Sequence, residues 1–212
     1  MKTIYDKYDK ARIKELPRAL FDGRIIVIRT EKDAIKATSY LRTFPLLGVD
    51  TETRPSFKKG VIHKVALLQV STEDTCFLFR LNIIGVPKCI VDLLQDESTV
   101  KVGLSLRDDF ASLHKRGLFE PHSFIELQDY VKEFGIQDMS LQKIYANIFR
   151  QKISKTQRLT NWEADVLTDS QKAYAATDAW ACIKLYKELE NLKQNRDYKL
   201  IVTEEPKAKG IE

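Results

Sequence analysis

Two kinds of hydrophobic pattern alternate along the chain. Short apolar runs such as the Ile-Ile-Val-Ile of residues 25–28 are typical of strands, and longer stretches with apolar residues three or four apart are typical of helices. Strands are predicted at residues 24–29, 46–53, 64–71, 75–81, 99–105 and 123–127, and helices at 30–42, 87–95, 107–116 and 171–192. The short step between the third and fourth strands permits a hairpin. This order predicts an α/β fold with a mixed β-sheet flanked by α-helices.

The longest predicted helix, residues 171–192, carries a carboxylate where an apolar residue is expected. One of its faces consists of Tyr174, Asp178, Ala181, Leu185, Leu189 and Leu192. An ionised carboxylate on a buried stripe is costly unless a cation or several hydrogen-bond donors meet it. Tyr174 lies one turn before Asp178, so both side chains point to the same place. They form either a structural pair in the core or part of a functional site.

A second pair of acidic residues lies on the strand predicted at residues 46–53. Because successive strand side chains alternate, Asp50 and Glu52 project to one face, beside Gly48. Two carboxylates on one face of a central strand repel each other unless a divalent cation holds them. The alternative is that the strand ends at Val49 and that both acids lie in a solvated loop.

The helix predicted at residues 107–116 offers two adjacent aspartates. Its apolar stripe runs through Leu106, Phe110 and Leu113, and Asp109 falls within this stripe, whereas Asp108 belongs to a wetter face. The periodicity therefore favours Asp109 as the inward carboxylate. The alternative is that both aspartates only complement the positive end of the helix dipole, an interpretation that we prefer for Asp108.

These acidic residues form a set of oxygen donors without histidine or cysteine. Asp50, Glu52, Asp109 and Asp178 suit hard ions such as Mg²⁺ or Mn²⁺. Two such ions ~3.5–4 Å apart can hold both the attacking and the leaving oxygen of a phosphodiester. The chain has only 3 histidines, so a zinc site is not expected.

Length and composition indicate one soluble domain. The 212 residues divide into a charged N-terminal extension (1–23), a main domain (24–194) and a polar C-terminal tail (195–212) that we expect to fray. We expect no membrane partner, because there is no run of 18 apolar residues and no apolar signal region at the start. The 3 cysteines are far apart, which indicates reduced thiols and a cytoplasmic location.

The net charge of +5 fits a polyanionic partner, although many soluble proteins are slightly basic. Candidate nucleic-acid contacts are Arg54, Phe57, Lys152, Lys155, Arg158 and Trp162. The three basic residues from 152 to 158 contact phosphates or form a solvated turn. Trp162 stacks on a base or, as we prefer, packs the loop before the long helix. Gln69 faces the site or, in the interpretation we slightly favour, occupies a polar edge position.

Three segments together resemble the motifs of the DEDD 3′–5′ exonuclease superfamily. Residues 48–53 (Gly-Val-Asp-Thr-Glu-Thr) resemble the first motif, and residues 102–109 (Val-Gly-Leu-Ser-Leu-Arg-Asp-Asp) resemble the second. Residues 174–179 (Tyr-Ala-Ala-Thr-Asp-Ala) resemble the third motif of the tyrosine-type (DEDDy) branch, and residues 160–171 resemble its lead-in. The chain is thus similar to the exonuclease domain of the Werner syndrome helicase and to ribonuclease D, from about residue 24 to residue 192.

This resemblance implies a ribonuclease H-like fold and a hydrolase that acts on a free 3′ end of nucleic acid. It implies that Asp50, Glu52, Asp109 and Asp178 hold two Mg²⁺ or Mn²⁺ ions, some through water, and that Glu52 and Tyr174 position the attacking water. The implied product is a nucleoside 5′-monophosphate, with DNA favoured over RNA as substrate. We expect no helicase and no accessory helical domain in a chain of this length.

Three alternatives to a DNA exonuclease remain open from the sequence. One is an exoribonuclease of the ribonuclease D type, since no residue that reads a 2′-hydroxyl can be placed. Another is a non-catalytic nucleic-acid-binding module on the same fold, although a binder gains nothing from acids that face phosphates. A purely structural protein, with its buried acids paired to arginine and lysine, is a further possibility.

Overall fold

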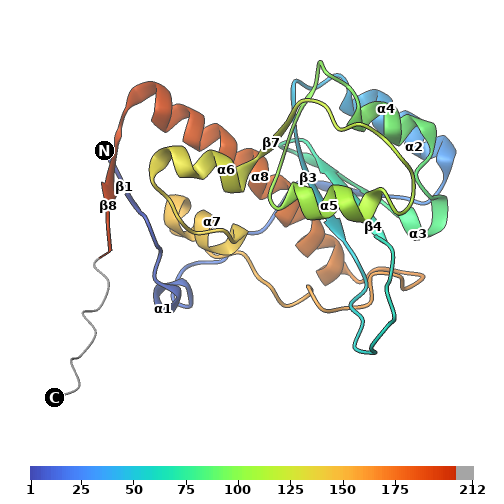
Figure 1. Ribbon diagram of the computed structural model, residues 1–212, viewed down its shortest axis with the longest axis horizontal. Helices are drawn as coiled ribbons and strands as arrows, with labels where there is room; N and C mark the ends of the chain where they lie inside the picture. Colours follow the sequence, from blue (N-terminus) through green and yellow to red (C-terminus); the bar gives the residue numbers. More distant parts are fainter. Residues whose placement is uncertain (204–212) are drawn as a thin grey trace.

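The computed structural model describes residues 1–203. Its strands are β1 (Lys2–Tyr5), β2 (Arg24–Ile28), β3 (Leu46–Glu52), β4 (Leu67–Ser71), β5 (Thr75–Phe79), β6 (Val100–Gly103), β7 (Phe124–Glu126) and β8 (Tyr198–Ile201). Its helices are α1 (Lys10–Ile13), α2 (Glu31–Leu41), α3 (Leu81–Ile84), α4 (Lys88–Leu94), α5 (Leu106–Leu113), α6 (Leu127–Tyr130), the 3₁₀ turn η1 (Val131–Phe134), α7 (Leu141–Phe149) and α8 (Asp169–Asn195). Figure 1 shows their arrangement. Within these residues no helix is both long enough and apolar enough to cross a bilayer.

A mixed sheet of six strands, in the order β2-β5-β4-β3-β6-β7, forms the centre of the molecule. Strands β3, β4 and β5 are antiparallel neighbours, whereas β2, β6 and β7 pair in parallel with theirs. The predicted hairpin between the third and fourth predicted strands is confirmed as β4 and β5. The predicted α/β fold with a mixed sheet flanked by helices is confirmed as well.

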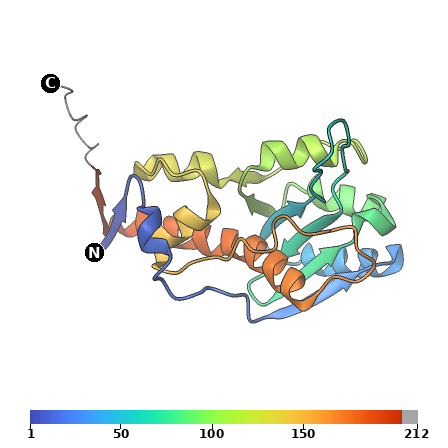
Figure 2. The same cartoon turned by 90° about the horizontal axis from the view of Figure 1, so that it is seen from below.

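Helices cover both faces of this sheet. The inner residues of α2, α4 and α5 pack with Leu47 and Val49 of β3 on one face, in a cluster that includes Leu106 and Leu113. On the other face, α8 crosses β3, β4 and β5. Figure 2 shows α8 running along the length of the molecule. Strand β3 is therefore covered on both faces, and its polar residues near the C-terminal end must find partners inside the protein.

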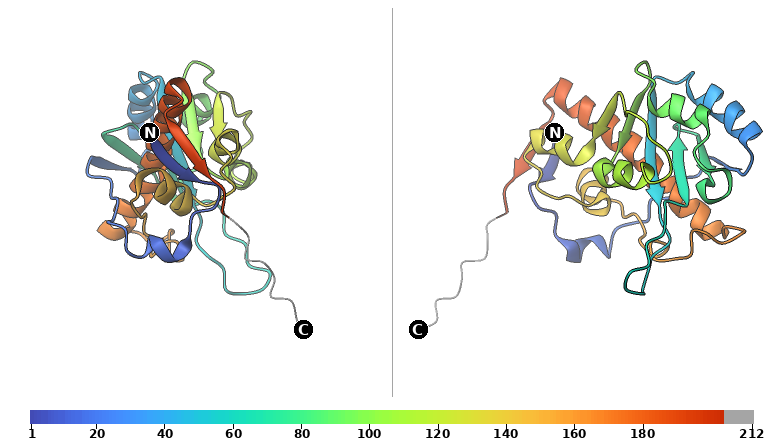
Figure 3. Two further views of the ribbon diagram at one scale, coloured as in Figure 1. Left: turned by 90° about the vertical axis from the view of Figure 1, so that its left-hand side faces the viewer. Right: turned by 45° about the vertical axis from the view of Figure 1, so that its right-hand side comes forward.

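The two flanking segments of the chain pair with each other. Strand β1 lies parallel to β8, with Lys2 opposite Tyr198 and Tyr5 opposite Ile201 (Figure 3). The expectation that the chain frays from residue 195 is therefore wrong for residues 198–201. The physical reason is a partner far away in sequence, which local composition cannot reveal. Residues 204–212 of the predicted tail lie outside the described part of the chain.

Candidate active site

Gly48 lets helix α8 lie directly against the central strand. A Cβ atom built on Gly48 would stand 2.0 Å from the carbonyl oxygen of Ala179, which no real side chain tolerates. Ala175 and Ala179, which lie on the same side of α8, are fully buried, and each has only a methyl group as its side chain. Because the two backbones approach so closely, residues next to this contact on α8 reach the acidic end of β3.

The start of α8 is fixed by its own sequence. Thr168 caps the helix by accepting a hydrogen bond from the Gln171 backbone, and the Gln171 side chain accepts one from the Thr168 backbone in return. Tyr174 and Asp178 follow at one-turn spacing, 7% and 6% exposed. The predicted face of this helix is thus directed into the protein, with Asp178 turned toward β3.

Three of the predicted carboxylates meet in one cluster. Ligand oxygens of Asp50, Glu52 and Asp178 all lie within 4.8 Å of one another. They line a cavity of about 360 Å³ together with Thr51, Ser105, Asp109, Ser140, Leu141, Arg158 and Tyr174. Among the described residues, buried Oδ1 of Asp178 has no hydrogen-bond partner. A buried carboxylate oxygen without a donor is costly, so this geometry suits a cation.

Asp109 lines the same cavity but lies outside the compact group of three. It accepts a hydrogen bond from the Thr51 hydroxyl, while its neighbour Asp108 is exposed to solvent. The periodicity of the sequence favours the same assignment, with Asp109 on the buried face of the helix and Asp108 on the exposed face.

The sequence patterns do not single out Thr51 or Glu126, although each of these side chains positions Asp109. Glu126 accepts hydrogen bonds of 3.0 and 2.6 Å from the backbones of Ser105 and Leu106, which fixes the start of α5.

Thr51 and Glu126 differ in whether the sequence alone could indicate their roles. The side chain of Thr51 follows the strand alternation to the face on which α5 packs, so its role could have been read from the period of two. Glu126 stands 21 residues after Ser105, and nothing local in the sequence points from one to the other.

Burial raises the pKa of every carboxyl group around this cavity, and repulsion from the other acidic groups of the cavity adds to the shifts of Asp50 and Glu52. Burial raises the pKa of Glu52 to about 9, with further contributions from Asp178 and Asp109, while Arg158 opposes the shift. Burial also raises the pKa values of Asp109 and Asp178 to about 7. The pKa of Asp50 rises well above its usual value, through burial and then its acidic neighbours. At neutral pH the cluster therefore retains protons that a divalent cation would replace.

The raised pKa values predict how the stability of the metal-free protein depends on pH. A raised pKa in the folded state means that the native protein binds more protons than the unfolded chain, so stability falls as pH rises. For Asp109 and Asp178 the loss should extend from about pH 4 to pH 7, with a slope of about 1.4 kcal/mol per pH unit for each extra bound proton. Urea denaturation in EDTA across this range checks it, and a free energy of unfolding that rises instead would contradict it.

The matched variants Asp109→Asn and Asp108→Asn test the assignment of Asp109, rather than Asp108, as the carboxylate that faces the cavity. If the chain has the hydrolytic activity that its sequence resemblance implies, Asp109→Asn, which removes a carboxylate from the cavity, should lower the rate by about a hundredfold or more, as loss of one transition-state contact typically does. The exposed Asp108 should tolerate the same change with less than about a twofold effect. Initial rates on one end-labelled strand compare the two variants, and an equal loss in both would contradict the assignment.

The predicted nucleic-acid contacts are only partly gathered at the cavity. Arg158 lines it, and Lys155 lies close enough for its pKa to respond to Asp178. The Arg54 guanidinium lies 3.3 Å from the Glu163 carboxylate, and Phe57 is 84% exposed on the loop after β3. Lys152 lines a different hollow, described below.

For Trp162 the structure confirms packing, the preferred interpretation, whereas for Gln69 the preferred polar-edge interpretation is wrong. Trp162 is fully buried, with its ring centre 6.0 Å from that of Tyr174, so it packs in the core and cannot stack on a base. Gln69 is not at a sheet edge, because β4 lies inside the sheet and Gln69 stands opposite Asp50 on β3. It is fully buried, and neither atom of its amide group has a hydrogen-bond partner within residues 1–203.

The sequence of the chain matches a known protein family and several known proteins. The family model described as "3'-5' exonuclease" matches residues 25–194. An Arabidopsis thaliana "3'-5' exonuclease" is 31% identical over 90% of this chain and 72% of its own length. The mouse "Bifunctional 3'-5' exonuclease/ATP-dependent helicase WRN" is 32% identical over 69% of this chain, but this covers only 11% of that protein.

A solved structure supports the fold independently. Escherichia coli RNase D, described as an exoribonuclease involved in structured RNA processing, superposes with a TM-score of 0.70. It is 21% identical, over 82% of this chain and 49% of the other. The fold is thus of the ribonuclease H-like exonuclease type. With the family match over residues 25–194 and the acidic cavity in place, the chain belongs to the 3′–5′ exonuclease family.

Proposed function

We propose that this protein is a divalent-metal-dependent exonuclease that removes nucleoside 5′-monophosphates from the 3′ end of DNA. The observation that carries the proposal is the convergence of Asp50, Glu52 and Asp178 within 4.8 Å in an accessible cavity. A cavity lined by repelling carboxylates has little use in a purely structural protein or in a passive binder of phosphates.

The residues present fit a hard cation. All the candidate ligands offer oxygen, and Oδ1 of Asp178 has no hydrogen-bond partner in the described part of the chain. Asp50, Glu52 and Asp178 would hold one ion, and Asp109 with Asp50 a second. When bound, the ions would neutralise charge on the phosphate and acidify the attacking water.

Two further side chains have defined roles in the proposed reaction. Burial, followed by the charges of Asp178 and Glu52 and a hydrogen bond to the Asp178 carboxylate, raises the pKa of the Tyr174 hydroxyl, so it stays protonated. In the proposed reaction this hydroxyl would donate its hydrogen bond to the attacking water instead. Arg158 carries a fixed positive charge on the cavity wall near Glu52, where it can contact a phosphate oxygen of the terminal nucleotide.

Tyr174→Phe tests the role of this hydroxyl. The change removes one hydrogen bond and no metal ligand, so kcat should fall only about five- to tenfold, the equivalent of about 1 kcal/mol. The melting curve in Mn²⁺ should keep its dependence on metal concentration. A loss of that dependence, or a collapse of activity as deep as that of a ligand variant, would contradict the assigned role.

One assay tests the proposed function. Single-stranded DNA, a duplex with a recessed 3′ end and an RNA of the same sequence, each labelled at the 5′ end, are incubated with Mg²⁺, Mn²⁺ or EDTA. We expect a ladder of products shortened one nucleotide at a time with either ion and none in EDTA. Oligonucleotides that are bound but returned intact in Mn²⁺ would instead indicate a non-catalytic binding module.

The preference for DNA rests on the sequence comparisons. The chain is 32% identical in sequence to the mouse Werner-type protein over 153 residues, whereas the superposition on RNase D, an exoribonuclease, indicates a shared fold. The same assay decides between DNA and RNA as substrate, because faster shortening of the RNA would reverse the assignment.

We propose a cytoplasmic location on the basis of the free thiols of Cys76, Cys89 and Cys182, which cell fractionation can check.

A further inference from the structure

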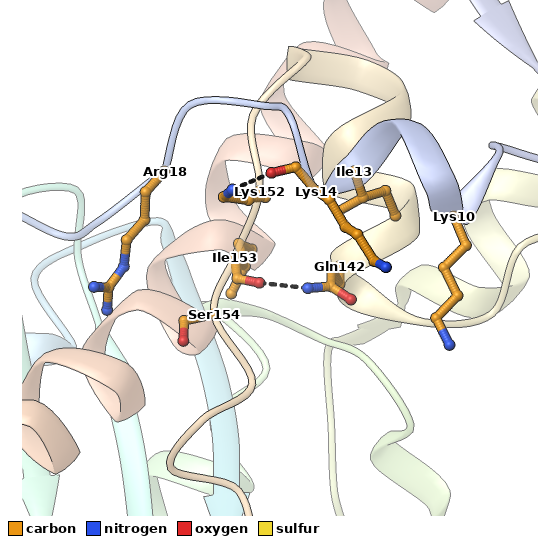
Figure 4. A pocket seen from close by; sticks show the side chains of 8 residues that line it. All are labelled: Lys10, Ile13, Lys14, Arg18, Gln142, Lys152, Ile153 and Ser154. Atoms are coloured by element: carbon orange, nitrogen blue, oxygen red, sulfur yellow. Dashed lines mark hydrogen bonds between the residues drawn. The ribbon is translucent and has the colours of Figure 1, made fainter.

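A second cavity, of about 370 Å³, lies between the N-terminal segment and the stretch that follows α7. We call it the basic hollow, and its polar wall consists of Lys10, Lys14, Arg18, Gln142, Lys152 and Ser154 (Figure 4). No acidic residue lines it. Within residues 1–203 none of its four cationic side chains forms an ion pair with a carboxylate. Four unmatched positive charges around one cavity favour an anionic occupant.

Backbone contacts hold the wall of the hollow in place. Residues 17–19 pair with Lys152, whose backbone nitrogen donates to the Pro17 carbonyl at 2.9 Å. The Lys152 amine donates to the Lys14 carbonyl, and the Gln142 amide donates to the Ile153 carbonyl at 2.7 Å (Figure 4). The hollow is therefore formed before any ligand arrives, which lowers the entropic cost of binding.

The basic hollow adjoins the catalytic cavity. Leu141 lines the catalytic cavity, and the next residue, Gln142, lines the hollow. On the other side, Ser154 belongs to the hollow and Arg158 to the catalytic cavity, with Lys155 between them in sequence. The pKa of Lys155 is lowered by burial and then by Arg158 and Lys10, while Asp178 opposes this shift. Lys155 thus lies within the electrostatic reach of both cavities.

We propose that the basic hollow binds backbone phosphates of the substrate strand, on the 5′ side of the terminal nucleotide held in the catalytic cavity. The inference rests on the proposed function and extends it, because it assigns the N-terminal segment to substrate binding. A strand that leaves the carboxylate cluster past Arg158 and Lys155 meets the four cations of the hollow next. Phosphate contacts of this kind are independent of base sequence.

The double variant Lys10→Ala/Lys14→Ala tests whether the basic hollow binds backbone phosphates. The charge-matched control is Lys32→Ala/Lys36→Ala, on the exposed face of α2. Each protein is assayed on a dinucleotide, whose single internucleotide phosphate is the one cleaved, and on a long oligonucleotide. For the long substrate, KM should rise about three- to tenfold with kcat unchanged. The slope of log KM against log salt should decrease by about 1.4 for two lost contacts on a single strand.

The control variant should leave both substrates within about twofold of the wild type. An equal effect of Lys10→Ala/Lys14→Ala on short and long substrates, or no effect on either, would overturn the inference. If the wild-type protein shortens neither substrate, the proposed function fails separately. Fluorescence anisotropy of the long oligonucleotide in EDTA then still tests the hollow, because the double variant should weaken binding by a similar factor and the control should not.

Discussion

Replacement of Asp50 by asparagine should abolish hydrolysis while leaving the protein folded and, without metal, more stable. The variant keeps the shape of the side chain but replaces one of three carboxyl groups, whose ligand oxygens lie within 4.8 Å of one another, with a neutral amide that is a weaker ligand for a hard cation. Divalent ions contribute several kcal/mol to stabilising the charge of a phosphoryl transition state, so the rate should fall by about a thousandfold or more. Release of labelled nucleotide under single-turnover conditions measures this loss.

The stability of the same variant separates a site residue from a structural one. Asp50 has a strongly raised pKa because burial and its acidic neighbours disfavour its charge, so the neutral amide should raise the melting temperature in EDTA. Asp22→Asn, at an exposed position in the loop before β2, is the control and should change neither activity nor melting. An Asp50→Asn protein that cleaves at the wild-type rate would remove Asp50 from the proposed site.

Mg²⁺ or Mn²⁺ should raise the melting temperature of the wild-type protein by about 5 to 10 °C at a hundredfold excess over the dissociation constant. The ions bind a cluster that exists only in the folded state, and they relieve the repulsion among its carboxylates. The effect should grow with pH between about 6 and 8, because the ions must displace protons from groups whose pKa values are raised to about 7. Scanning calorimetry at several metal concentrations measures the shift.

Monovalent salt at matched ionic strength is the control for screening, and it should reproduce little of the shift. The variant Asp178→Asn should reduce the shift, since Asp178 supplies the buried oxygen that has no other partner in the described part of the chain. A metal-independent melting temperature in the wild-type protein would show that these acids form a structural cluster.

The sequence revealed those features whose signal is local. The period of two along β3 placed Asp50 and Glu52 on one face, and the helical period placed Tyr174 and Asp178 together. The choice between Asp108 and Asp109 could also be made from periodicity, because the apolar stripe of α5 fixes which side of that helix is buried. Each of these predictions needed only the neighbouring residues along the chain.

Features that depend on distant partners could not be read in the same way. The pairing of β1 with β8 joins residues almost 200 positions apart, and the polar composition around residue 198 gave no sign of it. Gln69 was misjudged because its strand lies inside the sheet only through the order of pairing. The basic hollow likewise combines residues 10–18 with residues 142–154, and only the fold brings these charges together.

The contact between Gly48 and Ala179 also bears on which ions the enzyme can use. It is a contact between two backbones, so neither partner can swing aside to enlarge the gap. The distance from Asp50 to Asp178 is consequently set before an ion arrives. Mg²⁺ demands one compact geometry, whereas Ca²⁺ takes longer bonds and more ligands. We therefore expect this rigid frame to discriminate between ions by their radius, and the absence of a side chain at Gly48 is what sets the spacing.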